Sequence, residues 1–253
     1  MTSNSFLPPQ PVELRRRERP VIAIDGPAGA GKSTLAAHLA RTFGFLNLET
    51  GAMYRALALK AIENDFGFDE EAPLLELASR TRIKLEPQSE GNCVLLDGID
   101  VSRRIRDKDV TSGASQISVH PGLRSWMVTE QRALGQAGGV VMEGRDIGTA
   151  VFPDAEVKIF LDAAPEVRGN RRYRQLPGGP QEPKVTEVAL LNEMRERDER
   201  DRNRAESPLK PAADAILLDS TNLSLDEVLV EAEKIVREHL PVENRPKTGS
   251  LAP

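Results

Sequence analysis

The sequence predicts an α/β fold: an open, mostly parallel five-stranded sheet with helices on both faces, an inserted small antiparallel sheet, and a helical lid. Three observations lead to this prediction. Short apolar runs alternate with helical patterns along most of the chain, a glycine-rich turn joins the first apolar run to a helix, and one stretch of alternating residues interrupts this order. Strands that alternate with helices are typical of parallel sheets covered on both faces.

The five predicted strands are short apolar runs, as expected for parallel strands buried on both faces. They cover residues 21–25, 45–48, 140–142, 157–161 and 215–218. Apolar residues recur at helical spacing after the first strand and again over residues 225–240. Ser224 and Glu227 have the spacing of a capping box, which places the start of the last helix.

Two stretches depart from this order. Between residues 81 and 101 the hydrophobic period falls to two, and Asp97-Gly98 is typical of a hairpin turn, so we expect the small antiparallel sheet here. The arginine-rich stretch 168–204 is interrupted by Pro177-Gly-Gly-Pro180, which favours a mobile helical lid. The expected organisation is a flexible leader (1–18), a core (19–240) with an insertion (about 51–112) and a lid (about 168–205), and a flexible tail (241–253).

The composition excludes several classes of protein. The 253 residues include 34 basic and 39 acidic side chains, a net charge of −5 that does not favour a general nucleic-acid binder. No apolar run approaches the roughly 18 residues of a membrane span, and the N-terminal residues do not resemble a secretory signal. With a single cysteine, Cys93, these features predict a cytoplasmic protein that binds neither nucleic acid nor membranes.

Residues 26–33 fit the pattern G-x-x-x-x-G-K-[ST] between a strand and a helix, which is the context of a phosphate-binding loop. Glycines let successive backbone N–H groups surround phosphate oxygens, and the helix N-terminus favours negative charge. Lys32 is expected to reach the β- and γ-phosphates, and the Ser33 hydroxyl to ligate Mg²⁺. The expected nucleoside triphosphate site is Gly26, Pro27, Ala28, Gly29, Ala30, Gly31, Lys32, Ser33 and Thr34.

The loop alone does not define the reaction. The sequence lacks the N-K-x-D motif of guanine-reading GTPases, and none of its apolar strands ends in Asp-Glu as in many motor and transporter ATPases. Polar groups instead gather at the ends of other predicted strands, where ligands of open α/β sheets bind. These groups are residues 49–55, Ser115 with Arg124, residues 143–146 and residues 197–204.

Five motifs then occur in a fixed order: the phosphate loop, Thr50-Gly-Ala-Met-Tyr-Arg55, Gly144-Arg-Asp-Ile-Gly-Thr149, Val151-Phe-Pro-Asp154 and Arg197-Asp-Glu-Arg-Asp-Arg-Asn-Arg204. The ordered set closely resembles that of bacterial cytidylate kinases, a family of nucleoside monophosphate kinases. The resemblance covers about residues 20–240 and implies a P-loop kinase fold with an enlarged monophosphate-binding region at the predicted small sheet. Glu49 departs from the family, which more often has Asp there.

The resemblance implies a CMP site made of Thr50, Arg55, Ser115, Arg124, Arg145, Asp146, Arg197, Asp201 and Arg204. The planar guanidinium groups of Arg55, Arg145 and Arg204 suit the phosphate of the monophosphate. Asp146, with Arg124 and Thr50, is the candidate to read the pyrimidine edge, because a carboxylate accepts a hydrogen bond from the exocyclic amine of cytosine.

The mixed-charge run 195–204 has two interpretations. Such runs are usually solvated helices, which describes Glu196, Glu199 and Arg202. Three other members, Arg197, Asp201 and Arg204, are spaced i, i+4, i+7 and so share one helical face. The resemblance implies that Arg197 and Asp201, with Ser115, bind the pentose, and that Arg204 contacts phosphate.

The resemblance also implies a reaction, the Mg²⁺-dependent transfer of the γ-phosphoryl group of ATP to CMP or dCMP. It places the enzyme in pyrimidine nucleotide metabolism, and we expect the protein to be a monomer. Lys32, Arg145 and Arg204 are the candidate catalytic residues. The lid arginines Arg168, Arg171 and Arg172 are expected near ATP, with a solvated surface as their alternative, and the last two are assigned to the ATP site. Two other functions stay open: a kinase of the same fold acting on UMP or AMP, and a non-catalytic ATP-binding switch, against which the acceptor arginines argue.

Overall fold

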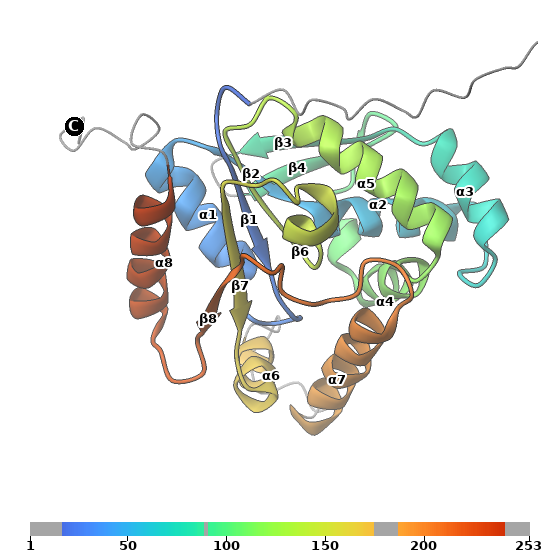
Figure 1. Ribbon diagram of the computed structural model, residues 1–253. Helices are drawn as coiled ribbons and strands as arrows, with labels where there is room; N and C mark the ends of the chain where they lie inside the picture. Colours follow the sequence, from blue (N-terminus) through green and yellow to red (C-terminus); the bar gives the residue numbers. More distant parts are fainter. Residues whose placement is uncertain (1–16, 89–90, 175–186, 241–253) are drawn as a thin grey trace, which may run out of the picture.

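The computed structural model describes residues 17–88, 91–174 and 187–240, so the predicted tail and most of the predicted leader lie outside the described residues. Five parallel strands form one sheet in the order β2-β6-β1-β7-β8 (Figure 1). They are β1 (Val21–Asp25), β2 (Leu46–Glu49), β6 (Val140–Gly144), β7 (Val157–Asp162) and β8 (Ile216–Asp219). The predicted sheet is confirmed, with strand ends that differ by one or two residues.

Helices cover both faces of this sheet (Figure 1). On one face lie α1 (Lys32–Phe43) and α8 (Leu225–His239), and on the other α2 (Thr50–Glu63), α4 (Lys108–Ile117) and α5 (Pro121–Gly135). Successive side chains of a strand point to opposite faces. In β1, Ile22 and Ile24 therefore pack with α1 and α8, whereas Val21 and Ala23 pack with α2 and α5, and all four are fully buried.

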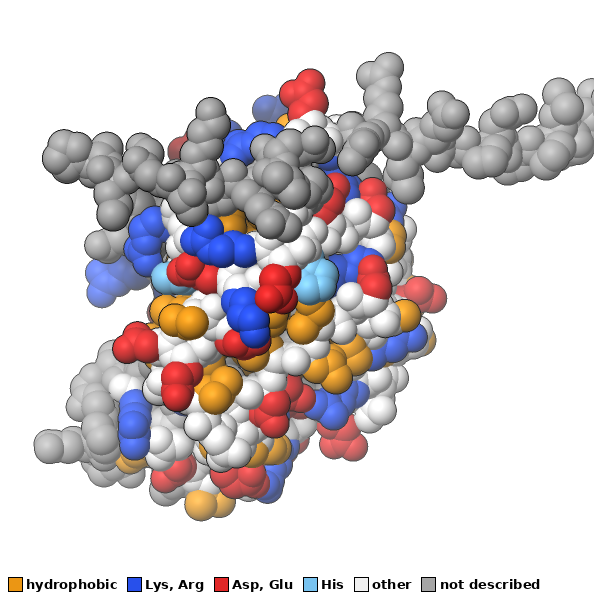
Figure 2. Space-filling model, turned by 60° about the vertical axis from the view of Figure 1, so that its left-hand side comes forward, with side chains coloured by type: hydrophobic (Ala, Val, Ile, Leu, Met, Phe, Trp, Pro, Cys, Tyr) orange, Lys and Arg blue, Asp and Glu red, His pale blue; other side chains and the backbone are white. Residues whose placement is uncertain are grey.

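Helix α8 begins with the predicted capping box. The Ser224 hydroxyl accepts the backbone N–H of Glu227 at 3.3 Å, and the Glu227 carboxylate accepts that of Ser224 at 2.8 Å. With α1 and α8 turned forward, the surface shows acidic and basic side chains interspersed with apolar ones (Figure 2). Along the described residues, no helix combines the length and apolar character needed to cross a bilayer.

The predicted small antiparallel sheet is also confirmed. It consists of β3 (Ile83–Gln88), β4 (Gly91–Leu96) and β5 (Ile99–Asp100) and follows α3 (Glu71–Ser79). Asp97 and Gly98 form the turn between β4 and β5 with φ of 51° and 88°. The Asn92 side chain joins this sheet to β2, because it accepts the Glu49 N–H at 3.0 Å and donates to the Asn47 carbonyl at 2.7 Å.

Two helices, α6 (Pro165–Arg174) and α7 (Glu187–Asn203), make up the described part of the predicted lid, whereas Pro177-Gly-Gly-Pro180 lies outside the described residues. Arg168 of α6 donates to Asp198 of α7 at 2.5 Å and to the Ala28 carbonyl at 2.9 Å. The Ala28 N–H in turn donates to Asp198 at 3.1 Å. The two helices are thus bonded to each other and to the phosphate loop.

Candidate active site

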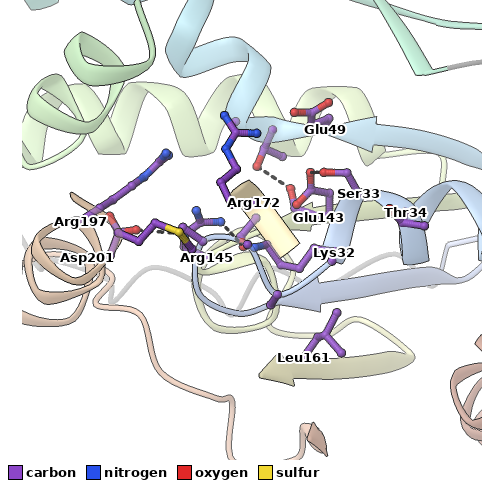
Figure 3. A pocket seen from close by; sticks show the side chains of 18 of the residues that line it. Lys32, Ser33, Thr34, Glu49, Glu143, Arg145, Leu161, Arg172, Arg197 and Asp201 are labelled. Carbon is purple, nitrogen blue, oxygen red and sulfur yellow. Dashed lines mark hydrogen bonds and ion pairs between the residues drawn. The ribbon is translucent and has the colours of Figure 1, made fainter. Parts of the chain in front are cut away.

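A cleft of about 860 Å³ opens at the carboxyl ends of the parallel strands. Its lining includes the phosphate loop, the starts of α1 and α2, residues of α4 and α5, the residues at the end of β6, and helices α6, α7 and α8. Figure 3 shows that Lys32, Ser33 and Glu143 lie on one side of the labelled group and Arg197 and Asp201 on the other. The cleft therefore has one end at the phosphate loop, here called the donor end because the loop motif is expected to bind the phosphoryl donor. Its second end is rich in arginine.

The phosphate loop has the backbone that its glycines predict. At Gly26 the φ is +149°, and an added Cβ would lie 2.0 Å from the Leu161 carbonyl oxygen, so only glycine fits. Gly31, with φ of 101°, precedes the first residue of α1, Lys32. The Lys32 ammonium group is buried and donates to the Pro27 carbonyl at 2.8 Å. Burial and the nearby Arg145 hold the pKa of Lys32 well below its usual range.

Glu143 faces the phosphate loop from the neighbouring strand. It lies at the end of β6, paired with Glu49 of β2, and it accepts a hydrogen bond from the Ser33 hydroxyl at 2.8 Å. Burial raises the pKa of Glu143. Glu143 belongs to the polar residues expected at strand ends, but no local pattern predicts a role for it. Its approach to Ser33 depends on the packing of β6 beside α1.

Arginine side chains converge on the second end of the cleft: Arg55, Arg124, Arg145, Arg197 and Arg204. Arg145 donates to Asp201 at 3.0 Å, and Arg204 lies 3.6 Å from both Asp201 and Asp146. The Nε of Arg197 is buried and has no hydrogen-bond partner among the described residues, and burial and Arg145 lower the pKa of Arg197 to about 10. Crowded, partly unpaired cations of this kind are suited to receive an anion.

Asp146 and Arg124 form a buried ion pair at this end, with 2.6 Å between Asp146 Oδ2 and a guanidinium nitrogen of Arg124. The Tyr54 ring lies 5.8 Å from the Arg124 guanidinium carbon, and burial raises the pKa of Tyr54 to about 12. The Thr50 hydroxyl donates to the Glu143 carbonyl at 2.8 Å. The structure thus brings together Thr50, Arg124 and Asp146, and it adds Tyr54, which the sequence analysis left without a role although it belongs to the Thr50–Arg55 motif.

The lid contributes to the donor end as well. Arg171 donates to the Ser220 hydroxyl at 2.9 Å and the Ser220 carbonyl at 2.8 Å, and its guanidinium also lies 3.4 Å from the Ala30 carbonyl. Arg172 also lines the cleft (Figure 3). An apolar wall completes this end, and sequence reasoning did not identify its members Leu223, Leu225, Val228 and Leu229.

Some predicted site residues do not line the cleft. Gly26 and Pro27 lie beneath the loop, where the Pro27 carbonyl holds Lys32. Ser115 is buried in α4 between cleft residues Ala114 and Ser118, and its hydroxyl lacks a hydrogen-bond partner. The lid arginine Arg168, expected near ATP, contacts Asp198 and the carbonyls of Ala163 and the loop residue Ala28, but it does not line the cleft.

Known proteins resemble this chain over most of its length. A family model described as cytidylate kinase matches residues 22–238. A cytidylate kinase of Aeromonas hydrophila is 51% identical over 211 residues, which cover 83% of this chain and 91% of that protein. A cytidylate kinase of Solibacter usitatus is 49% identical over 222 residues, which cover 88% of this chain and 94% of that protein. A solved shikimate kinase from Acinetobacter baumannii, in complex with shikimate, covers 89% of this chain and 97% of its own, with 16% identity and a TM-score of 0.44. On the extent of the family match and the identity to these relatives, the chain belongs to the cytidylate kinase family.

Proposed function

We propose that this protein transfers the γ-phosphoryl group of ATP to CMP or dCMP, giving CDP or dCDP and ADP. The observation that carries the proposal is the pairing, in one cleft, of a phosphate loop with a second cluster of cations around Arg145, Arg197 and Arg204. A second anion site so close to the first fits an acceptor that is itself a phosphate. An ATP-binding switch has no use for such a site.

The acceptor phosphate is assigned to Arg55, Arg145 and Arg204. Each lines the cleft and in this structure meets a carboxylate: Arg55 meets Glu49, Arg145 meets Asp201, and Arg204 lies near Asp146 and Asp201. A bound phosphate would compete with these carboxylates for the same guanidinium groups. Arg197 and Asp201, with Ser115 behind them, are assigned to the pentose.

The base is assigned to the end of the cleft around Asp146. An ionised carboxylate only accepts hydrogen bonds, so Asp146 can take one from the exocyclic amine of cytosine, whereas uracil offers a carbonyl oxygen there. Arg124 orients Asp146 through their 2.6 Å ion pair. Thr50 completes the polar surface, and Tyr54 supplies an aromatic ring beside it.

ATP is assigned to the loop residues that line the cleft, Ala28 to Thr34, with Gly26 and Pro27 shaping the turn beneath them. Lys32 would contact the β- and γ-phosphates. The apolar wall from Leu223 to Leu229 offers a surface for the adenine ring, and Arg171 and Arg172 close the donor end from the lid.

The residues around Ser33 fit a magnesium ion. Mg²⁺ prefers oxygen ligands, and the Ser33 hydroxyl and the buried Glu143 carboxylate lie 2.8 Å apart at the donor end. Burial raises the pKa of Glu143 although the nearby Lys32 lowers it, and a bound cation would favour the charged carboxylate further. Ser33, with Glu143 close by, would hold the ion, which would help to neutralise the charge of the ATP phosphates.

The proposed reaction requires no general base, because the acceptor is a phosphate oxygen that is already ionised at neutral pH. The chain's task is to hold donor and acceptor in line and to stabilise the charge of the transferring group. We assign that stabilisation to Lys32, Arg145 and Arg204. The lid and the inserted sheet would exclude water by closing over the substrates. A cytoplasmic location and a monomeric state remain our expectations.

A panel of acceptors tests the proposal. Release of ADP from MgATP is measured with CMP, dCMP, UMP and AMP in turn. We expect the highest kcat/KM with CMP, followed by dCMP, and little release without an acceptor. A preference for UMP or AMP would support the alternative kinase, and release independent of every acceptor would contradict the proposal.

A further inference from the structure

We propose that Asp25 is a positioning residue, whose side chain sets the base-reading segment Arg145–Asp146 against the phosphate loop. Asp25 is the last residue of β1 and directly precedes Gly26. The hydrogen bonds of its side chain go to the backbone that follows Asp146, and its charge also acts through space on Lys32 and Asp146, so its effect on the reaction is expected to pass mainly through the segment that it holds. The inference rests on the proposed function, because that function assigns Arg145 and Asp146 to CMP.

Both carboxylate oxygens of Asp25 accept hydrogen bonds from the backbone that follows Asp146. Oδ1 accepts the Ile147 N–H at 2.8 Å, and Oδ2 accepts the Gly148 N–H at 2.7 Å. These are the first N–H groups of the short helix η2 (Ile147–Val151), where donors have no partner within the helix. The Asp25 residue is only 5% exposed, so water does not compete effectively for these bonds.

The same residue anchors the other side of the segment. The backbone of Asp25 is the β-ladder partner of Gly144, the residue just before Arg145. Asp25 therefore holds the chain on both sides of Arg145 and Asp146. Its backbone pairs with Gly144 before them, and its side chain binds the N–H groups of Ile147 and Gly148 after them. Asp146 has φ of −149° and ψ of 24°, outside regular helix and strand, so neighbouring secondary structure does not fix its conformation.

The phosphate loop starts from this point too. Gly26 packs so closely on the Leu161 carbonyl that an added Cβ would lie 2.0 Å from its oxygen. The beginning of the loop therefore cannot shift independently of β1 and β7. Asp25 consequently fixes the spacing between the donor loop and the acceptor residues. In-line transfer is sensitive to this spacing, since a misplacement of about 1 Å can cost about 100-fold in rate.

The variant Asp25→Asn tests this role. The amide keeps one acceptor oxygen but turns an N–H₂ group toward a backbone N–H, so one of the two bonds is lost without a change of size. We expect kcat/KM for CMP to fall about tenfold or more. The ratio of kcat/KM for CMP to that for UMP should fall at least about threefold, while KM for ATP changes by less than about threefold.

Asp214→Asn is the matched control. Asp214 pairs with Lys158 at 2.8 Å, and the aliphatic part of Lys158 packs beside Gly148, so this variant loosens the same loop without touching its N–H groups. It should keep the wild-type CMP-to-UMP ratio. If Asp25→Asn fails to fold, Asp25→Ser, which replaces the carboxylate by a shorter hydroxyl, is judged by the same criterion.

The outcomes distinguish a failure of the proposed function from a failure of the positioning role of Asp25. Wild-type protein that does not phosphorylate CMP contradicts the proposed function itself. Wild-type protein that does so, combined with a folded Asp25 variant of unchanged CMP-to-UMP ratio, overturns the positioning role. A variant that loses thermal stability but keeps that ratio assigns Asp25 a structural role only, and also overturns the inference.

Discussion

At the scale of single residues, burial shifts the pKa values of Lys32 and Glu143 in opposite senses. The pKa of Lys32 is lowered by burial and by Arg145, and that of Glu143 is raised by burial. Both shifts disfavour the charged form. Bound MgATP would reverse both, because phosphate oxygens stabilise the ammonium group and a cation stabilises the carboxylate. In the free site the charged forms of Lys32 and Glu143 are thus disfavoured, and bound MgATP would stabilise both.

Proton uptake on ATP binding follows from the lowered pKa of Lys32. Between this lowered pKa and the usual value of 10.5, the free ammonium group is partly deprotonated, and nearby phosphates raise its pKa again. Near pH 8, titration calorimetry in buffers of different ionisation enthalpy should therefore show uptake of protons when ATP binds without Mg²⁺. Lys32→Ala should reduce the uptake and abolish detectable phosphoryl transfer. Equal uptake in both proteins would contradict the assignment.

Base selection is the second prediction at this scale. Asp146→Asn replaces an acceptor-only carboxylate with an amide that also donates, and so weakens discrimination by about 1–3 kcal/mol. The ratio of kcat/KM for CMP to that for UMP should fall accordingly. Tyr54→Phe is a useful companion variant, since it keeps the ring and removes only the phenolic hydroxyl. A ratio unchanged by Asp146→Asn would remove this residue from base recognition.

Sequence reasoning identified residues that lie within contiguous motifs, such as Lys32, Asp146 and Arg145. It did not identify the role of Asp25 or Glu143. The Asp25 side chain bonds to residues 122 and 123 positions away, and that contact exists only because β1 pairs with β6. Polar contacts that depend on strand register leave no local pattern for a single sequence to show.

At the scale of elements, helix α7 has two buried sides, one that faces the cleft and one that contacts the phosphate loop and Arg168. Arg197 and Asp201 of α7, and Arg204 directly after its last residue, line the cleft, as their spacing predicts. Asp198, one residue further round, faces the phosphate loop and Arg168. The intervening residues Glu196, Glu199 and Arg202 are exposed. The helix thus joins the acceptor end of the cleft to the donor loop.

An alanine scan along α7 should therefore be periodic. Asp201→Ala and Arg204→Ala should sharply lower kcat/KM for CMP, because each removes a group assigned to the acceptor. Glu199→Ala should change activity little and stability by less than about 0.5 kcal/mol, as for most exposed sites. Asp201→Ala should affect CMP and dCMP unequally, whereas Arg204→Ala should affect both alike. A flat profile would contradict the acceptor site on this helix.

Asp198 should matter for stability. Its pair with Arg168 is buried, with side chains only 9% and 4% exposed. Removing one partner of a buried pair leaves an uncompensated charge, which costs about 3–5 kcal/mol. Asp198→Ala should lower the free energy of unfolding by about that amount in urea titrations. Its exposed neighbour Glu199→Ala is the control, and a loss under about 1 kcal/mol for Asp198→Ala would show that this contact does not anchor the lid.

Helical periodicity predicted which residues of α7 share the cleft face, because spacing along a helix is a local property. Periodicity did not place Arg168, which the resemblance put near ATP and which in the structure pairs with Asp198 and also donates to the Ala28 carbonyl of the phosphate loop. Which arginine of an arginine-rich segment meets a ligand depends on the angle between α6 and α7, and no spacing rule determines that angle.

At the scale of the molecule, the sheet brings two anion sites to one edge. The phosphate loop follows β1, and the residues after β6 carry Arg145 and Asp146. These strands are neighbours in the order β2-β6-β1-β7-β8. Apolar runs and the loop motif predicted the strands and their parallel arrangement. The strand order, which makes the two sites adjacent, required the structure.

The central claim is that the cleft delivers the γ-phosphoryl group of ATP to the phosphate of CMP and not to water. The most direct measurement follows γ-labelled ATP with wild-type protein, with and without CMP, and separates labelled CDP from labelled inorganic phosphate. The account predicts that label appears in CDP in step with ADP, and that without CMP both ADP and inorganic phosphate form at a far lower rate. Label released as inorganic phosphate at the same rate with or without CMP would contradict it.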